Sequence, residues 1–135
     1  MYQFIVMRYP PKKDQATSSW SERNERESGK VAALRKAAIE AGVKRINGQV
    51  KLTLEIHIPN DQNAGDLANY IGGICDGLQT QPKNTVPHPA IPNPDIAIAY
   101  EDDKYVTEID AKIIYSSNNA WYQVSIEPLE GIIYD

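Results

Sequence analysis

Carboxylates in the second half of the chain are the residues whose type and spacing could do chemistry. In "GDLANYIGGICDGLQ" (65–79), Asp66, Asn69 and Asp76 recur at helical spacing, and Asp102, Asp103 and Glu108 follow later in the chain. Divalent ions such as Mg²⁺ prefer a few carboxylate ligands, which leaves positions for water and phosphate. Nucleases use such ions to activate water and to neutralise charge on the scissile phosphate. Acids in these positions could converge on a metal site, but they are equally common as helix caps and solubilising groups.

Other reactive residue types lack a supporting motif. No glycine-rich phosphate loop, zinc-type Cys/His cluster or Ser-His-Asp spacing occurs in the sequence. Cys75 is the single cysteine, so we expect a packing thiol and a reducing, cytoplasmic location. His57 alternates with apolar residues in "VKLTLEIHI" and is expected to face solvent, whereas His88 has no partner motif.

The elements that must position the acids follow from hydrophobic periodicity. The patterns predict strands at 2–8, 50–58, 104–115 and 120–129, and helices at 22–41 and 67–78. "SSNN" at 116–119 predicts a hairpin turn between the last two strands, and residues 79–100 form a loop with five prolines. The expected fold is α+β, with the order β-α-β-α-β-β. It is one domain over residues 1–135, in which a single mixed sheet of about four strands carries both helices on one face.

The second predicted helix should be two-faced. Apolar residues at three- and four-residue spacing would pack on the sheet: Leu67, Ile71, Ile74 and Leu78. The opposite face would turn polar or small residues outward or towards a cleft: Asp66, Asn69, Gly73 and Asp76.

Charge is divided unevenly along the chain, whose net charge is −4. Residues 1–51 hold 11 Lys/Arg against 5 Asp/Glu, and residues 52–135 hold 3 against 13. A basic first half beside an acidic second half suits a protein that grips phosphate with one part and metal with the other. Interleaved charges could also simply solvate a helix. The candidate phosphate-binding residues are Lys12, Lys13, Arg23, Arg26 and Lys30.

The run "EIHIPNDQNAGDLANYIGGICDGLQ", followed by "EDDKYVTEI", resembles the RusA-type Holliday junction resolvases. Asp66, Leu67 and Asn69 match the family's D-L-D-N motif, and Asp76 and Leu78 match positions further along its helix. Asp102 and Asp103, with Val106, match the acidic pair that precedes a later strand. The double proline at 10–11 and the basic first helix also agree, and this chain carries a longer proline loop.

The resemblance implies a homodimeric, Mg²⁺- or Mn²⁺-dependent endonuclease that cuts branched DNA, such as Holliday junctions, in recombination and repair. It assigns Asp66 and Asp103 as catalytic residues and Asp66, Asp102 and Asp103 as metal ligands. Asn69, Asp76 and Glu108 would support them.

Two departures bear on activity. Ala68 stands where the motif has its second aspartate, and Gly72 stands where the family carries a lysine. Asp102 or Glu108 could fill the place that Ala68 vacates. The alternatives are an inactive RusA-like DNA-binding or dimerisation module, and an acidic protein-binding domain that uses the proline loop. The apolar runs are too short to span a bilayer, the first residues lack the features of a signal peptide, and no membrane partner is expected.

Overall fold

The apolar alternation of "VKLTLEIHI" forms the central strand of a mixed sheet. The computed structural model describes residues 1–13, 17–59, 66–82, 85–116, 118–129 and 133–134. Strand β3 (Val50–Pro59) buries every second residue beneath the helices and turns its polar row to the other face. The other strands of this sheet are β1 (Tyr2–Val6), β4 (Val106–Ser116) and β5 (Trp121–Pro128). A separate two-stranded ladder, which the sequence patterns did not predict, joins β2 (Ile46–Asn47) to β6 (Ile133–Tyr134).

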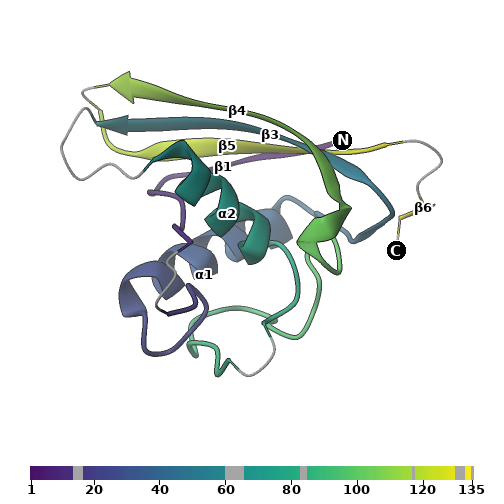
Figure 1. Cartoon of the computed structure of the whole chain (residues 1–135), viewed down its shortest axis with the longest axis horizontal. Coiled ribbons are helices and arrows are strands. Elements are labelled where there is room, and N and C mark those ends of the chain that lie inside the picture. The colour runs from purple at the N-terminus through teal and green to yellow at the C-terminus, as the bar shows by residue number, and fades with distance from the viewer. Residues whose placement is uncertain (14–16, 60–65, 83–84, 117, 130–132, 135) are drawn as a thin grey trace.

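The four main strands lie in the order β1-β5-β3-β4, and of the three pairs of neighbours in this sheet only β3–β4 is parallel (Figure 1). The predicted mixed sheet and α+β class are therefore confirmed. The predicted hairpin between the last two strands is wrong, because β3 lies between β4 and β5. β4 follows helix α2 and returns parallel to β3, so the chain must pass over the end of β3 before β5 can pair with its other side.

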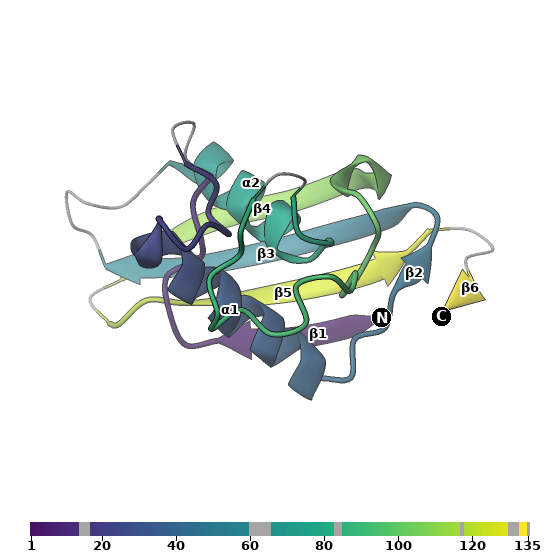
Figure 2. The same cartoon turned by 90° about the horizontal axis from the view of Figure 1, so that it is seen from below.

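Helices α1 (Glu25–Glu40) and α2 (Leu67–Gly77) cover one face of the sheet (Figures 1 and 2). α1 begins three residues later than predicted because the Asn24 side chain accepts a hydrogen bond from the Glu27 amide and caps the helix. α2 is capped in the same way by Asp66. Buried side chains between the layers include Leu34, Leu54, Ile74 and Tyr122. No helix in the described part of the chain is both long and apolar enough to cross a membrane.

The predicted outward face of α2 is wrong at Gly73. It is buried, and a Cβ at this position would lie 1.9 Å from the carbonyl oxygen of Pro11. The extended segment after β1 therefore packs its backbone directly on α2, which no residue larger than glycine permits. Tyr70 is also buried, at 1% exposure, although it lay outside the predicted apolar stripe.

Arg35 organises the described part of the proline-rich loop. Its side chain is fully buried and stacks over the ring of Trp20. The guanidinium donates hydrogen bonds to five backbone carbonyls, those of Gly77, Gln79, Pro92, Asn93 and Ile96. Burial lowers the pKa of Arg35 to about 10, which leaves it charged at neutral pH. The loop is thereby tied to α1 and to the end of α2.

Candidate acidic site at the end of helix α2

Asp76 and Asp103 form a carboxylate pair at the C-terminal end of α2. Asp76 belongs to the last turn of α2, and Asp103 begins the short helix η1 (Asp103–Tyr105) that leads into β4. The Asp103 amide donates to Oε1 of Gln79 at 2.9 Å, which holds η1 against the residues after α2. Burial raises the pKa of Asp76 to about 6, and the hydrogen bond and negative charge of Asp103 add to that rise while Lys13 opposes it.

Lys13 supplies the cation beside this pair. Its Nζ lies 3.6 Å from Oδ2 of Asp76, and its amide donates to the carbonyl of Asn69 at 3.1 Å. The aliphatic part of the side chain crosses α2 at Gly72, where an added Cβ would stand 3.1 Å from the Cβ and Cδ of Lys13. Gly72 thus leaves the space through which a lysine from another segment reaches the acids.

Two buried groups lie close to the pair, the Cys75 thiol and the Tyr100 hydroxyl. Cys75 is 6% exposed, and burial, together with the charges of Asp103 and Asp76, raises its pKa to about 12. The Tyr100 hydroxyl donates to the Cys75 carbonyl at 2.8 Å, and burial raises the pKa of Tyr100 well above its usual value. A protonated, buried thiol is a poor nucleophile, so Cys75 is the packing residue that was expected.

The structure does not bring Asp66 to this pair. Asp66 is the N-cap of α2, where Oδ1 accepts the Asn69 amide at 2.9 Å. Ten residues separate Asp66 from Asp76, which is about 15 Å along a helix axis. Asp66 therefore lies at the start of α2, and Asp103 lies beside Asp76 near the end of the helix. Figure 1 shows the start of α2 and the short helix that leads into β4 at opposite ends of α2. Ala68 is exposed in the first turn, beside Asp66.

Asp102 caps the short helix η1, and Glu108 lies on the sheet face opposite the helices. Asp102 is exposed, and Oδ1 accepts the Lys104 amide at 2.9 Å, a bond that lowers the pKa of Asp102. Glu108 is opposite Lys51 in the β3–β4 ladder, on the face that carries the polar row of β3. Among the described residues no group of three or more His, Cys, Asp or Glu side chains is arranged to hold a metal ion.

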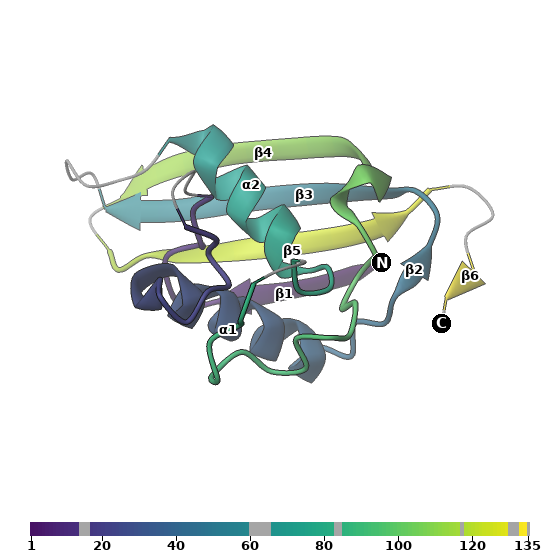
Figure 3. The same ribbon diagram turned by 60° about the horizontal axis from the view of Figure 1, so that its bottom comes forward.

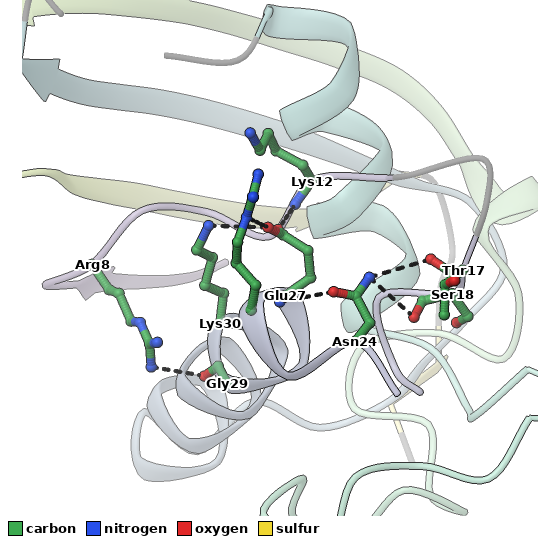
Figure 4. A network of polar contacts seen from close by, with 9 residues as sticks. Arg8, Lys12, Thr17, Ser18, Asn24, Glu27, Gly29 and Lys30 are labelled. Carbon is green, nitrogen blue, oxygen red and sulfur yellow. Dashed lines mark hydrogen bonds and ion pairs between the residues drawn. The ribbon is translucent and has the colours of Figure 1, made fainter. Parts of the chain in front are cut away.

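The candidate phosphate-binding residues gather around the start of α1 and the segment that crosses α2. Glu27 is 4% exposed and accepts the Lys12 amide at 2.6 Å and the Lys30 ammonium at 3.1 Å (Figure 4). Arg26 lies 3.6 Å from the same carboxylate, with its side chain 77% exposed. Lys30 is thus largely a structural partner of Glu27, whereas Lys13, Arg23 and Arg26 keep exposed cationic groups.

His57 is only partly open to solvent. Its ring stacks on Trp121 with 3.9 Å between ring centroids, and Nε2 lies 2.7 Å from Oε1 of Glu55. It lies on the sheet face opposite the helices, away from the carboxylate pair.

No protein-family model matches this chain, and no curated protein matches it. Tyr100 and Gln79, which shape the site, carry no motif that sequence reasoning could have used. Arg35, which shapes the loop beside it, offered one signal: it is a charged residue on the apolar side of α1, four residues after Val31 and three before Ala38.

Proposed function

We propose that the chain is a RusA-like, Mg²⁺-dependent endonuclease that acts on branched DNA such as Holliday junctions. The observation that carries the proposal is the Asp76–Asp103 pair with Lys13 beside it. Two nearby carboxylates suit one divalent ion that completes its coordination with water and phosphate oxygens. A lysine next to them suits a phosphodiester, whose charge it would offset.

The residues present fit Mg²⁺ or Mn²⁺ by number and by chemistry. Asp76 and Asp103 would hold the ion, because their mutual repulsion is relieved by a divalent charge. Bound metal would activate water and stabilise charge on the phosphate. Lys13 would orient the phosphate, and the exposed side chains of Arg23 and Arg26 would contact neighbouring phosphates.

Asp66, Ala68 and Asn69 lie at the N-terminal end of α2. The resemblance assigned Asp66 and Asp103 to one metal site, but within one chain the length of α2 separates them. This separation favours a second candidate, a RusA-like module that binds branched DNA or dimerises without cutting it. Both candidates suit a cytoplasmic protein with one unreactive thiol. They differ in their need for the metal.

Cleavage of a synthetic four-way junction tests the proposal, with Mg²⁺ or Mn²⁺ in one arm and EDTA in the other. We expect metal-dependent cutting by the wild type. Asp76→Asn and Asp103→Asn should each lower the rate of cleavage by roughly a hundredfold, because each removes a metal ligand. Glu40→Gln, an exposed acid at the end of α1, is the matched control.

Junction binding in EDTA separates the two candidates. Retained binding without cutting, in a wild type that also shows no metal-induced rise in Tm, would leave the non-catalytic module as the function. Absence of both binding and cutting would refute both candidates.

A further inference from the structure

A pocket lies between the C-terminal end of α1 and the described part of the proline-rich loop. It encloses about 510 Å³, and its walls come from residues 39–45 on one side and 93–98 on the other. Figure 3 shows the loop passing the end of α1 before it rises to β4. A pocket of this volume can hold a small organic molecule. Neither member of the Asp76–Asp103 pair lines it, so it is separate from the acidic site.

The first wall is fixed by the way in which α1 ends. Gly42 follows the helix with a φ of +76°, a conformation that favours glycine. Its amide donates to the Ile39 carbonyl at 3.0 Å, and the Val43 amide donates to the Ala38 carbonyl at 3.1 Å. These two bonds form a Schellman motif, which turns the chain back after a helix. Val43 therefore packs against the core, and the helix end has a defined shape.

The second wall is fixed by Arg35. Its guanidinium donates to the carbonyls of Asn93 and Ile96, and the Ile96 amide donates to the Asn93 carbonyl at 3.1 Å. The Ile46 amide donates to the Ala99 carbonyl at 2.9 Å and joins the two walls. The pocket is therefore formed before any ligand arrives, which reduces the entropy lost on binding.

The interior of the pocket is mainly apolar. Five aliphatic side chains line it, those of Ile39, Val43, Ile96, Ala97 and Ile98. Ile39 is 38% exposed and Ile96 is 54% exposed, although isoleucine is among the residues that are most often buried. Exposed apolar side chains that converge on a concave surface are typical of a ligand-binding site.

The acids at the rim of the pocket have cations of the same chain beside them. Glu101 forms an ion pair with Arg45. Burial lowers the pKa of Arg35 and the charge of Asp95 opposes this change, so Asp95 lies near that buried guanidinium. Lys44 also lines the pocket and is exposed, and no carboxylate in the described part of the chain pairs with it. The charge left to attract a ligand is therefore positive.

We propose that this pocket binds a small organic anion with an apolar body, such as an aliphatic carboxylate or an aromatic sulfonate. The anionic group lies at Lys44, and the apolar body lies against Ile39, Ile96 and Ile98. The apolar contact supplies most of the affinity, because an ion pair at an exposed lysine contributes little. The charge of Lys44 selects an anion over a cation. The inference stands on the pocket alone and does not depend on the proposed nuclease function.

Fluorescence titration of the folded chain with 8-anilinonaphthalene-1-sulfonate (ANS), an apolar sulfonate, tests the site. We expect saturable binding with a dissociation constant on the order of 10–100 μM, a range that a ligand of this size reaches in a formed pocket. Octanoate should displace ANS. Octylammonium, which has the same chain length and the opposite charge, should not displace it at the same concentration.

Substitutions at the rim assign the binding to this pocket. Ile96→Ser should weaken binding of ANS and octanoate roughly tenfold, because it removes apolar contact. Lys44→Gln should weaken both about threefold, and this difference should shrink at high salt. Met7→Ser and Lys36→Gln remove an exposed apolar residue and an exposed lysine that do not line the pocket, and they should leave binding unchanged. Circular dichroism confirms that each variant is folded.

Four outcomes would each overturn the proposal. They are the absence of saturable binding, equal displacement of ANS by octylammonium and octanoate, binding that Ile96→Ser leaves unchanged, and binding that Lys44→Gln leaves unchanged. The last of these would leave an apolar pocket without the selection for an anion.

Discussion

The side chain of Lys13 crosses α2 at Gly72 and brings its ammonium to 3.6 Å from the carboxylate of Asp76. The two residues are far apart in the sequence, and the contact exists because the segment after β1 lies directly on the helix. Lys13 thereby places a cation against the acidic pair at a point where the helix itself offers none.

The close packing of Pro11 on Gly73 makes the neighbouring glycines Gly72 and Gly73 of α2 unequal in their tolerance of a larger side chain. Gly73→Ala should destabilise the fold by about 3 kcal/mol, because the new methyl meets backbone that must move. Gly72→Ala should change stability by less than about 1 kcal/mol, since it meets only the flexible stem of Lys13 and gains helix propensity. Urea unfolding of both variants checks this, and equal losses would contradict the packing described.

Asp76 should make stability fall as the pH rises in metal-free buffer. Its pKa in the folded chain is about 6, above the ordinary value of 3.8, so between these values the folded state holds a proton that the unfolded chain has released. Asp76→Asn should remove this dependence and raise the free energy of unfolding by about 2 kcal/mol at pH 7.5. Urea titrations from pH 4 to 8 in EDTA measure the effect, with Glu40→Gln as the control. An unchanged slope in Asp76→Asn would show that Asp76 does not carry the shifted proton.

Arg35 should be required for the order of the proline-rich loop. Arg35→Met leaves five backbone carbonyls without their donor, and we expect a loss of about 3 kcal/mol or more. Arg35→Lys should recover only part of this, because an ammonium cannot reproduce the planar guanidinium. Urea unfolding measures the loss, and limited proteolysis within 79–100 reports the loop. The exposed neighbour Lys36→Met is the control, and a loop that stays resistant in Arg35→Met would contradict the anchoring role.

The exposed cations should contribute to junction binding unequally, if the proposed function holds. Removing the charge of Lys13 or Arg23 should weaken binding and reduce the slope of log affinity against log salt by about one each, the value for one lost phosphate contact. Lys30→Ala should instead lower stability, because Lys30 is 15% exposed and pairs with the buried Glu27. Fluorescence anisotropy at several salt concentrations, with urea unfolding alongside, separates the two effects. Equal salt slopes for all three variants would show that Lys30 also binds phosphate.

Sequence by itself determined the elements and the class of the fold. Period-two alternation at 50–59 and period-3.6 spacing in the two helices are local patterns. Each predicted element is present in the structure because its apolar face is buried in the core. The position of β5 in the sheet could not be predicted from local patterns. A short turn between two strands favours a hairpin. In the structure β3 lies between β4 and β5 and pairs along both of its edges, and this strand order depends on the whole sheet.

The site was decided by tertiary structure for the same reason. The resemblance assigned Asp66 and Asp103, which belong to two separate motifs of the sequence, to one site. The length of α2 separates them within the chain, because a helix advances a fixed distance with each residue. Asp76 and Lys13 have no shared motif, and they meet because Gly72 and Gly73 let an extended segment lie against the helix. Spacing along the chain could therefore identify the acids, but only the packing of β1's continuation on α2 decided which of them form a pair with a cation beside it.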